Sequence, residues 1–351
     1  MDIVLSHTTA LAAYRAGIAT RPAADSRLPA KAPGAAEVLA WRSASTLAGN
    51  LPHPLTLLVG ESDAHTKNSV YRTSYSSPLP KRSLVAVTEE VRIVTPELLA
   101  LQMARVATTT ELAMLVSELC GLYAIRPDTP TGLVQRARPL TSASRIDAYL
   151  KELGGVPGIR KLRSACALSF DRSGSPMESK LAARVSWPRS KGEYAVPILA
   201  MNDELEVRRI TRNLSNAQVR KPDLLFSLPH EGKPGLCLDY HGDIHHGEGR
   251  PEQDALRVNE LLAFGLQPYT LWHDQYQGTA YLDGLIDGVV RQKLGLTRHR
   301  PNESRATLEL ARRELLLAEL NAVDGMSWGT SDSSPEALLA RERVDEALSR
   351  L

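Results

Sequence analysis

Residues 220–246 read RKPDLLFSLPHEGKPGLCLDYHGDIHH, and this stretch predicts the fold of the C-terminal half of the chain. Two short apolar runs, Leu224–Phe226 and Leu236–Leu238, stand on either side of a connection rich in proline and glycine. Runs of this length around turn residues are typical of a β-hairpin. Antiparallel pairing of the two strands then brings Asp223, at the start of the first, close to Asp239, at the end of the second.

The second strand of this hairpin has two different faces, because side chains alternate along a strand. Asp239 and His241 share one face with Cys237, and the other face is apolar. Two carboxylates at the ends of buried strands repel each other and resist desolvation, so packing alone does not favour them. A divalent cation relieves both penalties, and Mg²⁺ or Mn²⁺ prefers carboxylate oxygen. We therefore expect Asp223 and Asp239 to hold Mg²⁺ or Mn²⁺.

The pairs Pro222-Asp223 and Asp239-Tyr240-His241 resemble the motif of the PD-(D/E)xK nuclease superfamily, except that His241 stands where the family has lysine. Over residues 173–294 the chain is more similar to very-short-patch-repair endonucleases and their bacterial relatives, in which glycine and further histidines follow. The resemblance implies a restriction-endonuclease-like α/β domain with a mixed sheet. It also implies metal-dependent hydrolysis of DNA phosphodiester bonds, with a role in phage defence or DNA repair.

Glu178 is the third candidate metal ligand. The order Ser175-Pro176-Met177-Glu178 is that of a helix capping box, with a cap, a proline in the first turn and a glutamate three residues after the cap. In the family resembled, a glutamate on this first helix points at the metal. The capping box alone also explains both Ser175 and Glu178, so the two interpretations stay open.

Two histidines, His241 on the second strand and His245 after it, extend the candidate site. His241 is suited to taking a proton from the attacking water, because histidine titrates near neutral pH. In the repair endonucleases resembled, histidines take such roles, which implies that His245 contacts the phosphate or the leaving group. A structural zinc held by Cys237, His241, His245 and His246 is the alternative use of this cluster, although no second pair of ligands with zinc spacing is present.

The elements that flank the hairpin predict the remaining core of the domain. A helix is expected from Pro251 until Gly265, a strand over Gln267–Trp272 and an amphipathic helix over Tyr281–Leu294. This order agrees with the core of the fold resembled. Polar residues on the first of these helices are expected to support the site: Gln253, Asp254 and Arg257.

A local basic cluster is the candidate DNA-binding surface. The formal net charge is only +2, so the chain as a whole has no strong positive field. Basic residues that no acid interrupts lead into the hairpin: Arg208, Arg209, Arg212, Arg220 and Lys221. Such a cluster is suited to DNA phosphates. A solvated strand and loop is the alternative.

The length of 351 residues predicts more than one domain. We expect a small α+β domain over residues 1–127, a helical connector over 128–172, the nuclease-like domain over 173–296 and appended helices over 297–351. The polar stretch Asp324–Ser334 between the last two helices is expected to be a preferred protease site. Those helices are suited to covering the core, forming a homodimer or binding a protein partner.

The N-terminal segment has a resemblance of its own. Ser6-His7-Thr8-Thr9-Ala10-Leu11 and the helix entry Val94-Thr95-Pro96 resemble antitoxin-like proteins of abortive-infection systems. That resemblance implies a winged helix and a DNA-binding regulator. A scaffold or partner-docking domain is the alternative, because the first helices lack a basic face. The absence of the family lysine also leaves open a catalytically inactive nuclease fold that binds DNA or protein.

The cysteines and the N-terminus predict a cytoplasmic protein. Cys120, Cys166 and Cys237 are widely spaced and odd in number, which is typical of a reducing compartment. The N-terminus lacks the pattern of a signal peptide. No apolar run reaches the length needed to span a membrane, so we expect no membrane partner.

Overall fold

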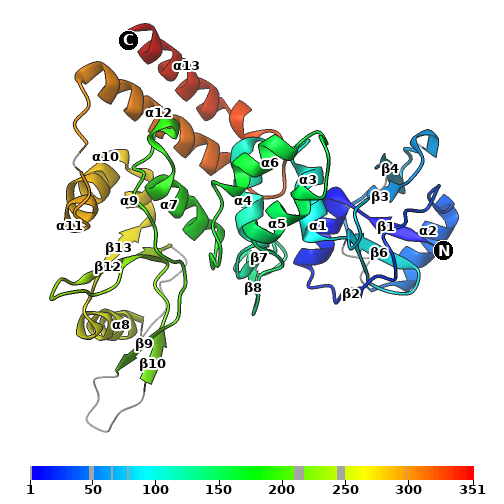
Figure 1. The fold of residues 1–351 in the computed structure, drawn as a ribbon, viewed down its shortest axis with the longest axis horizontal. Helices are drawn as coiled ribbons and strands as arrows, with labels where there is room; N and C mark the ends of the chain where they lie inside the picture. Colours follow the sequence, from blue (N-terminus) through cyan, green and yellow to red (C-terminus); the bar gives the residue numbers. More distant parts are fainter. Residues whose placement is uncertain are drawn as a thin grey trace.

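The computed structural model describes residues 2–46, 51–64, 66–76, 79–208, 217–242, 250–297 and 299–351. The molecule is elongated, with an N-terminal sheet at one end, a group of helices in the middle, and a second sheet with covering helices at the other end (Figure 1). Helices combine with a mixed sheet, which confirms the predicted α/β class. No helix in the described ranges is both long and apolar enough to cross a membrane.

The N-terminal sheet is mixed and has six strands in the order β2-β5-β6-β1-β3-β4. The strands are Ile3–Leu5 (β1), Arg21–Pro22 (β2), Leu55–Val59 (β3), Tyr71–Tyr75 (β4), Leu84–Ala86 (β5) and Val91–Val94 (β6). Strand β1 runs parallel to β6 and antiparallel to β3. Helix α1 (His7–Arg15) follows β1 directly, with Ser6 as its N-cap. Helix α2 (Ala35–Ala44) lies between β2 and β3 in the chain.

Four helices and a small hairpin form the middle of the molecule. They are α3 (Pro96–Met103), α4 (Thr109–Leu119), β7 (Tyr123–Ile125), β8 (Leu133–Gln135), α5 (Ala143–Lys151) and α6 (Ile159–Cys166). Their buried side chains Leu112 and Leu162 belong to the same apolar cluster as Leu57 and Ile93 of the N-terminal sheet. The helices expected as a connector therefore pack in the N-terminal core. A winged helix in this half of the chain stays a prediction.

The C-terminal half contains the predicted hairpin, which is confirmed. The elements are α7 (Pro176–Ser186), β9 (Leu205–Arg208), β10 (Ala217–Arg220), β11 (Leu224–Ser227), β12 (Gly235–His241), α8 (Arg250–Phe264) and β13 (Leu266–Trp272). Strand β12 is the centre of a three-stranded sheet, antiparallel to β11 and parallel to β13. Its two faces are those expected, because Leu236 and Leu238 pack with α7 while Cys237 packs with Leu261 of α8.

The chain continues from β13 through a series of helices. They are α9 (His273–Gln277), α10 (Thr279–Leu282), the π-helical η5 (Asp283–Val290), α11 (Arg291–Lys293), α12 (Glu303–Ala322) and α13 (Pro335–Ser349), with a short 3-10 turn at Ser331–Ser333. Two further 3-10 turns lie earlier in the chain, at Ser62–Ala64 and Arg189–Lys191. Helix α12 joins the two halves, because Leu316 and Leu320 enter the N-terminal core while Leu317 packs against the core of the hairpin domain. Helix α13 packs along α12 through Val344 and Ala347.

The loop between α12 and α13 is anchored to the N-terminal half by hydrogen bonds, and its sensitivity to protease stays a prediction. The carboxylate of Glu111 on α4 accepts backbone N–H groups from Gly329, Thr330 and Ser331 at 2.6, 2.9 and 2.8 Å. Burial alone would raise the pKa of Glu111, but these donors outweigh it and lower the pKa. The guanidinium of Arg15 also donates to the carbonyl oxygen of Gly325. The polar sequence of the loop does not indicate these hydrogen bonds, because Glu111 and Arg15 are distant from the loop in sequence.

Glu111→Gln is expected to increase protease cleavage within residues 324–334 by about tenfold or more. Hydrogen bonds to a charged group stabilise by about 1.5–3 kcal/mol, and the amide keeps only part of that energy. Limited proteolysis followed by mass spectrometry measures the rate. The matched control is Glu89→Gln at an exposed position of the same half, which should leave the rate unchanged. Equal rates for wild type and Glu111→Gln would show that Glu111 does not hold the loop.

Candidate functional site

Asp223 and Asp239 lie side by side at the open end of the hairpin. The Asp223 backbone N–H donates to Oδ1 of Asp239 at 3.1 Å, and the Tyr240 N–H donates to Oδ2 of Asp223 at 2.6 Å. Each carboxylate is thus fixed by the backbone of the opposite strand. The expected proximity of the two aspartates is confirmed, and the register that pairs Leu224 with Leu238 produces it.

Glu178 approaches from the first turn of α7. The Ser175 hydroxyl accepts the Glu178 N–H, as predicted for the N-cap, but the Glu178 carboxylate does not complete a capping box. Its Oε2 accepts instead from Gly174 N at 2.7 Å and from Asn202 Nδ2 at 2.6 Å. A Cβ at residue 174 would lie 3.1–3.2 Å from both Glu178 oxygens, so glycine permits this close approach. Glu178 is therefore oriented by more than the helix cap.

The three carboxylates influence one another electrostatically. Desolvation raises the pKa of Asp223 well above its usual value, and the charges of Glu178 and Asp239 raise it further. Desolvation also raises the pKa of Glu178, with a contribution from Asp239. The pKa of Asp239 is raised by desolvation as well, although the Arg257 guanidinium opposes this rise. The site is therefore a cluster of acids that would gain from a positive charge.

Arg257 of α8 supplies one such charge. Its Nη2 donates to Oδ1 of Asp239 at 2.9 Å and to the carbonyl oxygen of Lys221 at 3.0 Å. Its Nε is buried and has no hydrogen-bond partner among the described residues. The expectation that Arg257 supports the site agrees with this geometry.

The donor set fits a divalent cation held by few protein ligands. Asp223 Oδ1 and Asp239 Oδ2 accept no hydrogen bond from the described part of the chain, whereas the Glu178 carboxylate is held by Gly174, Ser175 and Asn202. Within that same part, no three His, Cys, Asp or Glu side chains come together as a complete metal-binding group. Mg²⁺ commonly keeps several waters and uses one or two carboxylates together with substrate phosphate. The pair Asp223 and Asp239 fits that mode, and their role as ligands stays a prediction.

His241 extends the same strand face beyond Asp239. Its ring stacks edge-on against Trp272, with centroids 5.1 Å apart, in the parallel register of β12 and β13. A charge on His241 would lower the pKa of Asp239, so the two groups are close enough to interact. The sequence places Trp272 at the end of a predicted strand but does not indicate its contact with His241. His245 and His246 lie outside the described residues, so neither the role of His245 nor the zinc alternative is tested.

Acidic side chains already form ion pairs with part of the basic cluster. Arg220 pairs with the fully buried Glu260 of α8, with Nη2 and Oε2 2.5 Å apart, which gives Arg220 a packing role. Lys221 pairs with Glu204 at 2.9 Å, but both side chains are largely exposed. Exposed pairs of this kind are weak, so Lys221 stays accessible to a phosphate. Arg208 is the last residue of β9, and Arg209 and Arg212 lie outside the described ranges.

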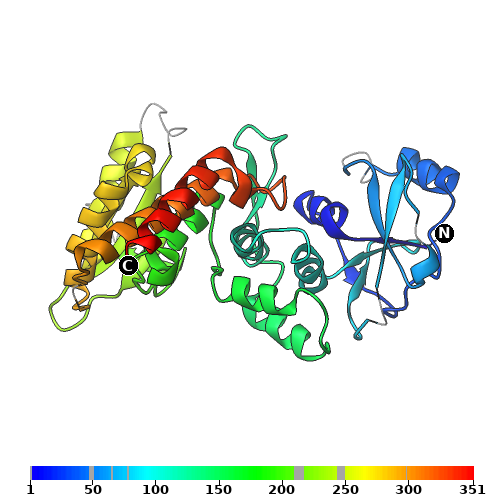
Figure 2. The same ribbon diagram turned by 90° about the horizontal axis from the view of Figure 1, so that it is seen from above.

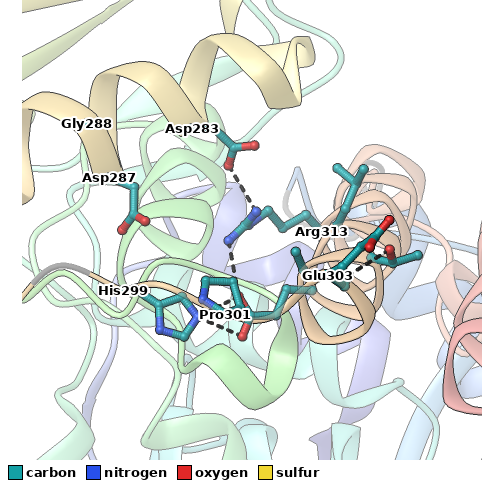
Figure 3. A pocket seen from close by; sticks show the side chains of 11 residues that line it. Asp283, Asp287, Gly288, His299, Pro301, Glu303 and Arg313 are labelled. Carbon is teal, nitrogen blue, oxygen red and sulfur yellow. Dashed lines mark hydrogen bonds and ion pairs between the residues drawn. The ribbon is translucent and has the colours of Figure 1, made fainter. Parts of the chain in front are cut away.

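A separate cavity of about 520 Å³ lies between η5 and α12 and contains none of the candidate catalytic residues. Figure 3 shows Arg313 reaching toward Asp283, and their nitrogen–oxygen distance is 3.0 Å. Arg313 also lies 3.8 Å from Glu309. His299 lies 2.8 Å from Glu309. Arg313 and Glu309 thus pair within the wall of this cavity, which none of the three carboxylates of the candidate site lines.

The raised pKa values predict how stability depends on pH. Between the ordinary aspartate pKa of about 3.9 and the raised pKa of Asp223, the folded state binds more protons than the unfolded state. Stability of the metal-free protein therefore falls as the pH rises through this window. Asp223→Asn should flatten the dependence and raise Tm at neutral pH by about 2–4 °C, the shift that roughly 1 kcal/mol produces in a domain of 150–250 residues.

Thermal melts with EDTA between about pH 5 and pH 8 measure this effect. Asp203→Asn, at an exposed position of the same domain, is the control and should follow the wild type. Parallel curves for wild type and Asp223→Asn would contradict the titration of Asp223 in this window.

The fold and the site define an α/β protein with a mixed sheet and a cluster of carboxylates at the end of a β-hairpin. Comparisons of the chain with protein-family models, with curated proteins and with solved structures find no match. The residues and their geometry are therefore the grounds for any function.

Proposed function

We propose that this chain is a metal-dependent nuclease that hydrolyses DNA phosphodiester bonds. The observation that carries the proposal is the paired placement of Asp223 and Asp239, which are fixed by reciprocal backbone hydrogen bonds. The negative charge of Glu178 raises the pKa of Asp223 further, beyond the effect of desolvation. Packing does not require such a cluster, and its mutual repulsion is a cost that binding of a cation relieves.

The residues take separate roles in this proposal. Asp223 and Asp239 would hold Mg²⁺ or Mn²⁺, and the ion, when bound, supplies a positive charge for the phosphate oxygens. His241 takes a proton from the attacking water on the side of the strand that carries Asp239. Glu178 would act on the ion or through a water molecule from α7. Lys221 contacts the DNA backbone as an exposed positive charge.

The proposed compartment and biological role follow from the free cysteines and from the resemblance to PD-(D/E)xK nucleases. All three cysteines are free, which supports the proposal of a reducing cytoplasm. We propose a role in phage defence or DNA repair there. A protein partner or a second copy of the chain is proposed for α13, because Leu338 and Leu339 are about half exposed at 48% and 54%.

One contact favours a second function. Arg257 already pairs with Asp239, so the chain provides part of the positive charge that a metal ion would bring. A nuclease fold of this kind can be stable without metal and serve as an antitoxin-like DNA-binding regulator or a protein-interaction module.

A cleavage assay separates the two functions. The purified protein is incubated with supercoiled plasmid, a mismatched DNA duplex and single-stranded RNA in Mg²⁺, Mn²⁺ or EDTA. The nuclease proposal predicts cleavage of DNA that EDTA stops. Retardation of DNA in a gel without cleavage in either metal would favour the regulator, and cleavage of RNA alone would replace the proposed substrate.

A further inference from the structure

A second cavity, of about 560 Å³, opens between α1 and the loop that joins α12 to α13. Figure 2 shows this loop reaching back from the C-terminal helices to α1. The cavity contains none of the residues of the carboxylate site. Its volume lies within the range of about 300–1,000 Å³ that is usual for small-molecule sites.

The walls of this cavity are largely apolar. Leu11 of α1, Leu51 and Ile125 line it from the N-terminal half, and Met326 and Trp328 line it from the loop. Met326 is a large apolar side chain that lines this open cavity and is 55% exposed. An apolar ligand body would cover this surface, and the indole of Trp328 offers a flat face for a ring.

Three arginines line the same cavity, and their partners differ. Arg15 forms a buried ion pair with Glu118 at 2.6 Å, and Arg126 pairs with Asp128 at 2.6 Å. Arg42 donates only to neutral groups in the described part of the chain: the Leu51 carbonyl oxygen at 3.0 Å and Nδ1 of His53 at 2.9 Å. The wall of the cavity therefore carries one positive charge that no described acid balances.

We propose that this cavity binds a small organic anion with an apolar, ring-containing body. The anionic group, a carboxylate, sulfonate or phosphate, pairs with Arg42, and the body packs between Leu11 and the side chains of Met326 and Trp328. Charge-assisted hydrogen bonds to a guanidinium are the strongest interactions available for such a group. The ligand contacts both halves of the molecule, because Leu11 lies on α1 in the N-terminal half and Met326 lies in the loop between the C-terminal helices α12 and α13.

The test uses 8-anilinonaphthalene-1-sulfonate, an aromatic anion, as a fluorescent probe with the full-length protein. The wild type is expected to bind one equivalent in a saturable manner. Arg42→Gln should weaken binding about tenfold or more, because it removes a charged hydrogen-bond donor. Arg21→Gln, an exposed arginine outside the cavity, is the matched control and should bind as the wild type does.

Two further measurements make the result specific. Ala12→Phe places a ring in the cavity from α1 and should abolish saturable binding. The uncharged analogue N-phenyl-1-naphthylamine should bind equally to wild type and Arg42→Gln, because it lacks the sulfonate. Unchanged affinity of the sulfonate for Arg42→Gln, or for a folded Ala12→Phe variant, would overturn the proposal. If Ala12→Phe does not fold, the comparison of Arg42→Gln with Arg21→Gln decides alone.

Discussion

Asp223→Asn is expected to abolish the stabilisation of the protein by Mg²⁺ or Mn²⁺ and to lower DNA cleavage by about 10²–10³-fold, the scale on which loss of one preorganised electrostatic contact acts. A bound ligand at a concentration of 100 times its Kd stabilises the folded state by about 2.7 kcal/mol. That increment requires the carboxylate charge, because a neutral amide oxygen is a much weaker ligand for a hard cation. Melting curves with and without metal, recorded beside plasmid cleavage, measure both effects.

The same substitution has the opposite effect without metal, which makes the experiment decisive. Asp223→Asn stabilises the metal-free protein at neutral pH, because it removes a desolvated charge beside two other acids. A cluster with no metal would show this gain and no change in response to Mg²⁺. A metal site shows the gain together with loss of the metal-dependent rise. An equal rise in wild type, Asp223→Asn and the Asp203→Asn control would place the ion elsewhere.

The core of the hairpin domain was predictable because its signals are local. Alternation along Leu236–His241 specifies which side chains enter the core, and turn residues specify antiparallel pairing. These two facts alone place Asp223 beside Asp239. The prediction succeeds because a strand has one period and a hairpin has one direction of pairing.

The contacts that complete the site were not predictable, because each joins distant parts of the chain. Asn202 reaches Glu178 from a residue with a φ of 50°, a left-handed conformation that its own sequence context does not announce. Arg220 was expected on a DNA-binding surface, but Glu260 on α8 binds it. A basic run in a sequence shows where charges occur, and only the fold shows which of them an acid has already neutralised.

His241→Ala is expected to lower DNA cleavage by about 10²–10⁴-fold, the contribution of a general base. DNA affinity and stabilisation by metal should stay close to wild type, because Asp223 and Asp239 remain in place. His230→Ala is the matched control, since this histidine lies in the exposed turn of the same hairpin. Cleavage, DNA binding and melting are measured on the same three proteins.

The pattern across these measurements assigns the role of His241. If the imidazole is a metal ligand, the alanine variant loses both cleavage and the metal-dependent rise in Tm. If it serves only to pack against Trp272, the variant melts at a lower temperature with no selective loss of chemistry. His241→Lys introduces the residue of the family resembled and is expected to retain part of the activity. An active wild type with an equally active His241→Ala would remove the imidazole from the mechanism. The mechanism would then rest on Glu178, Asp223 and Asp239, with Arg257 paired to Asp239 beside them.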